Sequence, residues 1–115
     1  MDVRIGEFGR VEAGELQTID CQTIIDGLRV RRVGNITFDV VQRFVDEIVV
    51  LLDREIFEAV IWIMERCKLI VEGAAAAPVA ALPHRLVKLP PASRVAVVLS
   101  GGNVNLDQLR SMKRN

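Results

Sequence analysis

Tyrosine is absent from this sequence of 115 residues, and aromatic residues make up only 4% of it. An excess of charge of one sign is also absent, because 15 basic residues balance 15 acidic ones. Surfaces that bind nucleic acid combine a basic stripe with interleaved aromatic side chains, and the sequence contains no such stripe. Nucleic acid is therefore not expected as a partner.

Long apolar runs are missing as well. Roughly 20 consecutive apolar residues are needed to cross a bilayer, and every apolar run here is far shorter. The first ten residues, MDVRIGEFGR, contain no apolar stretch of the kind that a secretion signal requires. The sequence therefore predicts no contact with a membrane and a cytoplasmic location.

Cysteine and histidine are scarce. Cys21 and Cys67 are the two cysteines, and they stand far apart and outside any Cys-x-x-Cys pattern, so we expect two buried thiols. His84 is the single histidine, and no acid or nucleophile stands beside it in LPHRL. We expect it in a loop or at a helix end, and we predict no metal site.

What the sequence has in quantity is hydrophobic residues, at 50% of the chain. This content is ample for the core of one small domain, and no repeat or linker divides the chain, so residues 1–115 are expected to form a single unit. Gly34-Asn35 predicts a turn and Thr37 the N-cap of a helix over 37–45. The β-branched run EIVVLL follows, and a second helix is predicted to begin at Asp53.

The helix predicted from Asp53 onward carries two apolar rows. One row consists of Ile56, Val60, Ile63 and Cys67, and the other of Phe57, Ile61 and Met64. A helix with so narrow a polar strip is expected to be buried on two sides. Trp62 is expected to pack against a neighbouring element.

The stretch LIVEGAAAAPVAAL predicts a short strand followed by an alanine-rich helix, with Glu72 at the junction as a structural cap. Helices that alternate with short β-branched runs are typical of an α/β fold. We therefore predict three layers, in which a partly parallel sheet is flanked by helices and its crossovers are right-handed.

The final apolar run, Val95–Leu99, is expected to be a strand buried on both faces, and it leads directly into Ser-Gly-Gly-Asn. In open α/β sheets, ligands bind beyond the carboxyl ends of strands, so Ser100 stands where a small-molecule contact is expected. The same residues are good turn formers, and from this pattern alone a simple turn remains an equal alternative.

Four stretches in order resemble the pyridoxal-phosphate-dependent threonine/serine dehydratase family, which includes serine racemases: TIIDGLRV, ITFDVVQRFVDEIV, KLIVEGAAAAPVAAL and VAVVLSGGNVNL. The resemblance spans about Val11 to Leu109. It implies that the predicted sheet is part of a larger domain of PLP fold type II, which is tryptophan synthase β-like. It also implies the conversion of L-threonine to 2-oxobutanoate and ammonia, although the sequence does not choose between threonine and serine.

The resemblance further implies contacts with pyridoxal 5'-phosphate in the complete enzyme. Ser100 matches the serine that hydrogen-bonds the pyridine nitrogen of the cofactor in that family. A neutral hydroxyl leaves this nitrogen largely unprotonated, whereas a carboxylate would hold a proton there. The six matching residues are Ser100, Gly101, Gly102, Asn103, Glu72 and Gly73. No catalytic residue is assigned.

Several motifs of the family have no counterpart here. The lysine of a Ser-x-Lys-x-Arg motif, the four-glycine phosphate loop and the metal-site motif are missing. Ile25 stands where the family has alanine, and Leu52 replaces a Ser/Thr cap, which leaves Asp53 as the cap of the second helix.

We therefore expect a C-terminal part of a dehydratase catalytic domain that is inactive alone and binds no cofactor by itself. Its expected partner is the missing N-terminal half of that domain or a second copy of the chain. The alternative is a non-catalytic interaction or regulatory module that retains the dehydratase fold.

Overall fold

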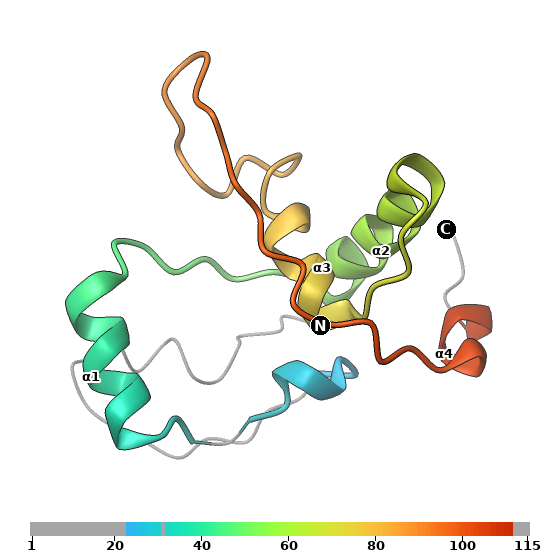
Figure 1. Cartoon of the computed structure of the whole chain (residues 1–115), viewed down its shortest axis with the longest axis horizontal. Coiled ribbons are helices and arrows are strands. Elements are labelled where there is room, and N and C mark those ends of the chain that lie inside the picture. Colours follow the sequence, from blue (N-terminus) through green and yellow to red (C-terminus); the bar gives the residue numbers. More distant parts are fainter. Residues whose placement is uncertain (1–22, 31, 112–115) are drawn as a thin grey trace. The chain divides into compact units, whose positions relative to one another are not determined.

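The structure, a computed structural model, describes residues 23–30 and 32–111. The chain divides into two compact units, Met1–Asp53 and Arg54–Asn115, and each is described by itself. The described elements are η1 (Asp26–Leu28), α1 (Asn35–Phe44), α2 (Asp53–Cys67), α3 (Gly73–Ala80) and α4 (Leu106–Ser111) (Figure 1). That residues 1–115 act as one structural unit stays a prediction.

Helix α1 begins two residues earlier than the sequence predicts. Gly34 is its N-cap, with an extended backbone at φ −65° and ψ 147°, and the Phe38 N–H donates to the Gly34 carbonyl at 2.9 Å. Glycine is also favourable at the N-cap, so the helix can begin before Thr37. The prediction that Thr37 is the N-cap was wrong. Phe38 is the buried residue of this helix.

The side chain of Asp53 accepts hydrogen bonds from a segment far from it in sequence. The buried Thr23 hydroxyl donates to Asp53 Oδ1 at 2.7 Å, and the Ile24 N–H donates to Asp53 Oδ2 at 3.2 Å. Thr23 Oγ1 in turn accepts from the Ile25 N–H at 3.0 Å. Asp53 is the first residue of α2 rather than the residue before it, so the prediction that it is the N-cap of this helix was wrong.

Helix α2 buries three of the four residues of its first apolar row. Ile56, Val60 and Ile63 are at most 1% exposed, whereas the second row of Phe57, Ile61 and Met64 is half-buried. Burial on two sides is thus found only in part.

Two further features of this helix differ from expectation. Trp62 lies outside both apolar rows and is 52% exposed, so neighbouring elements cover it only in part. Cys67 is a free, exposed thiol because it is the last residue of the helix, where fewer neighbours cover a side chain. Cys21 lies outside the described residues.

Helix α3 confirms the predicted alanine-rich helix. Its buried residues are Ala75, Ala76, Ala77 and Ala80, and their small side chains permit close packing. A turn follows, in which Arg85 adopts a left-handed backbone at φ 53° and the Leu86 N–H donates to the Ala81 carbonyl at 3.2 Å. This closure is the usual C-terminal motif of a helix, and it places His84 at the helix end, as predicted.

None of the described residues is assigned to a β-strand, and the sheet of the predicted α/β fold stays a prediction. A strand needs a neighbour with which to exchange backbone hydrogen bonds. One such bond joins two of the predicted strand ends, from the Glu72 N–H to the Gly101 carbonyl at 3.1 Å. The run Val95–Leu99 is not buried on both faces as expected, since Val98 is 75% exposed. In the other predicted strand, Ile70 is 60% exposed.

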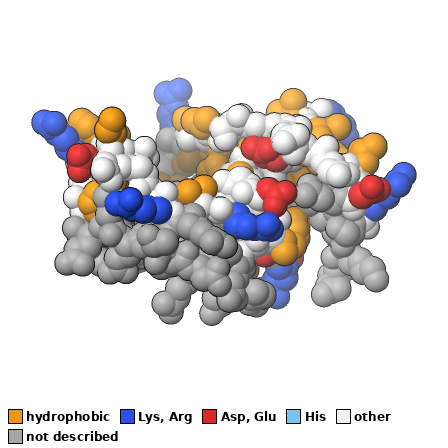
Figure 2. All heavy atoms as spheres, turned by 90° about the horizontal axis from the view of Figure 1, so that it is seen from below, with side chains coloured by type: hydrophobic (Ala, Val, Ile, Leu, Met, Phe, Trp, Pro, Cys, Tyr) orange, Lys and Arg blue, Asp and Glu red, His pale blue; other side chains and the backbone are white. Residues whose placement is uncertain are grey.

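The surface combines apolar side chains with charges of both signs. Figure 2 shows one face, on which hydrophobic side chains lie among scattered basic and acidic groups. Within residues 23–30 and 32–111, no helix is long and apolar enough to cross a membrane.

Candidate functional site

The second unit brings the start of α3 against the Ser-Gly-Gly-Asn stretch. The Glu72 N–H donates to the Gly101 carbonyl at 3.1 Å, and the Glu72 carbonyl accepts from Ala76 at the first turn of α3, also at 3.1 Å. The end of the apolar run 95–99 and the start of α3 are therefore joined directly through the backbone. Figure 1 shows the run following an extended path toward this junction.

Gly101 leaves room for a side chain from the other segment. A Cβ atom on Gly101 would lie 2.9 Å from Cδ of Glu72 and closer still to its Oε1. The Glu72 carboxylate therefore occupies the space that any other residue at position 101 would fill. Gly101 does not have a left-handed backbone, so close approach rather than backbone conformation accounts for this glycine.

Gly102 meets the backbone of the same segment. Its Cβ position would lie 3.2 Å from the carbonyl oxygen of Ile70, which is tighter than an ordinary contact. The Gly102 carbonyl accepts from the Val104 N–H at 2.9 Å, so the chain turns at once after this contact. The two glycines together allow residues 101–102 to lie flat against residues 70–72.

Glu72 is the N-cap residue of α3, as predicted, but its side chain makes no capping hydrogen bond. The half-buried side chain lies against Gly101 instead. A negative charge at this end of a helix is favourable, because the unpaired N–H groups of the first turn carry partial positive charge. Glu72 thus occupies the predicted cap position, and its side chain contributes through packing and the helix dipole rather than through a capping hydrogen bond.

Ser100 stands at the exposed side of this junction. The residue is exposed, and its hydroxyl makes no hydrogen bond to any residue in the described part of the chain. Gly73 is the first residue of α3 and is half-buried, and Asn103 is exposed. An available hydroxyl thus stands next to flat backbone and a helix N-terminus.

Three of the six predicted residues make described contacts at the junction: Glu72 and Gly101 with each other, and Gly102 with Ile70. Gly73 and Ser100 adjoin them in sequence. Asn103 follows directly in sequence, without a described contact to the others. Sequence reasoning missed Ile70, whose carbonyl contacts Gly102, because a backbone contact leaves no signal in residue type. No group of three metal-ligating side chains occurs within residues 23–30 and 32–111.

Comparison with known proteins identifies the family. A profile of pyridoxal-phosphate dependent enzymes matches residues 5–101. The chain belongs to this family. The match covers both stretches of the junction, apart from the last glycine and Asn103.

Two of the similar proteins are L-threonine ammonia-lyases. The chain is 39% identical over 88 residues to an L-threonine ammonia-lyase of Thermotoga maritima and 42% identical over 84 residues to one of Geobacter sulfurreducens. These alignments cover 76% and 73% of the chain and 21% of each relative. The chain thus spans about a fifth of the length of the relatives that it matches.

Solved structures agree with this assignment. A T.th. threonine deaminase superposes with a TM-score of 0.76 at 31% identity, over 84% of this chain and 35% of that one. Maize serine racemase superposes with a TM-score of 0.77 at 32% identity, over 89% of this chain and 33% of that one. The chain therefore corresponds to part of the PLP fold type II domain. Pyridoxal phosphate is the cofactor of the complete enzymes of this family.

The residues at the junction fit this cofactor. The pyridine nitrogen of pyridoxal phosphate accepts a hydrogen bond from a neutral hydroxyl, and Ser100 offers one that is exposed and unpaired among the described residues. A flat aromatic ring requires a wall without protruding side chains, and Gly101 and Gly102 supply bare backbone beside that hydroxyl.

Proposed function

We propose that the chain forms one wall of the cofactor site of an ammonia-lyase that acts on L-threonine or L-serine. The observation that carries the proposal is the exposed Ser100 hydroxyl beside Gly101, which is packed against Glu72 at the start of α3. The relatedness to two L-threonine ammonia-lyases supports the reaction class.

The role proposed for Ser100 is to present a neutral donor to the ring nitrogen. When bound, pyridoxal phosphate supplies a conjugated ring that stabilises negative charge at the substrate's Cα. Because the Ser100 hydroxyl has no charge, it does not hold an extra proton on the nitrogen, and the ring withdraws electrons less strongly. Elimination tolerates this weaker withdrawal because the β-hydroxyl group leaves with the electron pair.

The two glycines and Glu72 position the wall. Gly101 and Gly102 keep the backbone flat, and the Glu72 N–H holds the Gly101 carbonyl at 3.1 Å. This contact orients the peptide that follows Ser100. Ser100 is therefore fixed through its neighbour rather than through its own side chain.

We further propose that the lysine and the phosphate cradle come from polypeptide outside these 115 residues, so that the chain is inactive alone. The apolar residues exposed along the predicted strands support this proposal. Leu69, Ile70, Val95 and Val98 are 48–75% exposed, although short apolar runs rich in valine and isoleucine are typical of buried strands. Additional strands, from the rest of such a domain, would cover them.

A chimeric enzyme tests the proposal. In the Thermotoga maritima enzyme, the segment that corresponds to this chain, through the position of Asn103, is replaced by the residues of this chain. We expect pyridoxal-phosphate-dependent release of 2-oxobutanoate from L-threonine. The isolated chain should release none under the same conditions. A chimera that folds and binds the cofactor but has no lyase activity would contradict the proposed function.

Ser100→Ala in the chimera tests the role of the hydroxyl. The loss of one hydrogen bond, about 0.5–1.5 kcal/mol, should weaken cofactor affinity roughly two- to twelvefold. Ser93→Ala is the matched control, because the Ser93 hydroxyl donates to the Pro90 carbonyl at 2.7 Å, away from the junction. Equal cofactor affinity in the two variants would show that Ser100 does not contact the ring.

A further inference from the structure

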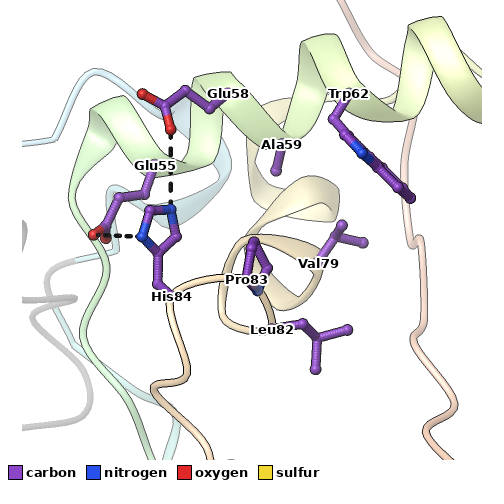
Figure 3. Close-up of a pocket in the computed structure, with 8 residues that line it drawn as sticks. All are labelled: Glu55, Glu58, Ala59, Trp62, Val79, Leu82, Pro83 and His84. Carbon is purple, nitrogen blue, oxygen red and sulfur yellow. Dashed lines mark ion pairs between the residues drawn. The ribbon is translucent and has the colours of Figure 1, made fainter.

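A groove lies between α2 and the turn that ends α3, away from the junction that holds Ser100. Its volume is about 430 Å³. The eight lining residues, drawn in Figure 3, are Glu55, Glu58, Ala59, Trp62, Val79, Leu82, Pro83 and His84. None of them belongs to the cofactor wall, so the proposed lyase function leaves this groove without a role.

The two ends of the groove differ in chemistry. Figure 3 shows the Trp62 ring at one end, with Ala59, Val79 and Leu82 between it and the polar end. Trp62 is 52% exposed, so its ring offers an accessible apolar face. An aromatic ring of this size contributes a large contact area to any apolar partner.

The other end of the groove carries two carboxylates and one imidazole. His84 Nδ1 lies 3.5 Å from Oε1 of Glu55, and His84 Nε2 lies 4.0 Å from Oε2 of Glu58. Glu55 lies against one nitrogen of the imidazole, and the Glu58 carboxylate presents negative charge at this end of the groove. The Glu58 contact is longer than a strong charge-assisted hydrogen bond, which is about 2.7–2.9 Å. Glu58, at 62% side-chain exposure, is therefore accessible to another cation.

We propose that this groove binds a small organic ammonium ion with an apolar body. The ammonium group lies at Glu58, and the body packs on Trp62 and Leu82. A groove that is apolar along its length and negative at one end complements such an ion in both shape and charge. Its volume lies at the small end of the usual range of ligand pockets, about 300–1,000 Å³, which suits a body of one ring and a short chain.

The fluorescence of Trp62 can report binding in this groove. Trp62 is the single tryptophan and tyrosine is absent, so intrinsic fluorescence comes almost entirely from this residue. We would titrate the chain with 4-phenylbutylamine, and with 4-phenylbutanol and 4-phenylbutyrate as the neutral and anionic counterparts. We expect a saturable change in Trp62 emission, with the amine bound about two- to fivefold more tightly than the alcohol, as an exposed ion pair permits. The carboxylate should bind most weakly.

Glu58→Gln should lower the affinity for the amine to that for the alcohol. Glu65→Gln is the matched control, because it removes the same charge from the same helix outside the groove. The proposal is overturned if the alcohol binds as tightly as the amine, or if both variants weaken the amine equally. Should Glu58→Gln fail to fold, the comparison of the three probes on the unchanged chain decides by itself. Because no activity is measured, this result is independent of the lyase test.

Discussion

Replacement of Gly101 by alanine tests the packing of the cofactor wall directly. The new Cβ would lie 2.9 Å from Cδ of Glu72 and 3.5 Å from its Cγ, so the carboxylate has to move away. The obstacle is the end of a flexible side chain rather than backbone. The expected cost is that of an unfavourable rotamer, about 0.5–1.5 kcal/mol of unfolding free energy.

Whether Gly101→Ala lowers or raises the free energy of unfolding should depend on the side chain of Glu72. Once Glu72→Ala removes the carboxylate, an alanine at position 101 meets no obstacle from that side chain. Gly101 does not have a left-handed backbone, so Gly101→Ala should then stabilise the chain by about 0.4–1 kcal/mol through a less flexible unfolded state. The coupling free energy between the two substitutions is therefore expected to be about 1–2.5 kcal/mol, the sum of those two ranges.

Urea unfolding of the four chains of this double-mutant cycle, followed by Trp62 fluorescence, measures the coupling. Gly102→Ala is the control, because its Cβ meets the carbonyl oxygen of Ile70 at 3.2 Å, which the truncation of Glu72 does not remove. Its effect should be the same with and without Glu72→Ala. Additive effects of Gly101→Ala and Glu72→Ala would refute the conclusion that the carboxylate occupies the space left by Gly101.

Three further outcomes are expected. Arg85→Gly should raise the free energy of unfolding by about 0.5–1 kcal/mol, because glycine tolerates the left-handed backbone at φ 53°; Arg85→Ala, which keeps the strain, should give no gain in the same urea titration. Ile63→Ala should cost about 2–4 kcal/mol, and Ile61→Ala on the half-buried row clearly less; equal losses would contradict the assigned burial. Sedimentation equilibrium should show self-association that Val98→Lys weakens, and an unchanged association constant would exclude Val98 from the contact.

The helices were largely predictable from the sequence. Apolar spacing predicted α2 and the alanine run predicted α3, because both signals are local in the chain. The start of α1 was missed because a threonine hydroxyl is a visible capping group in the sequence, whereas Gly34 has no side chain to signal its role. The Gly34 carbonyl accepts the first helical hydrogen bond. Burial was harder to predict, since the exposure of Trp62 depends on neighbours that are distant in sequence.

The candidate site was predicted mainly through the resemblance. The pattern of residues alone left Ser100 equally well explained by a turn, and the four ordered motifs favoured the cofactor wall. Why position 101 is glycine could not be read from sequence, because the reason is a carboxylate from Glu72, which becomes a neighbour only in the folded chain. A sheet requires backbone hydrogen bonds between strands. Among the described residues, one such bond joins two predicted strands, from the Glu72 N–H to the Gly101 carbonyl.

The buried face of α3 has a consequence for how this chain tolerates mutation. Alanine has no side-chain rotamers, so no rotamer entropy is lost when Ala75, Ala76, Ala77 and Ala80 are buried. The close packing around them leaves no space for a larger side chain. Apart from glycine and serine, every amino acid that a single-nucleotide change at an alanine codon can introduce adds bulk or charge. In a saturation-mutagenesis library, these four positions should accept glycine and serine only, whereas the exposed Pro78 on the same helix should accept most residues.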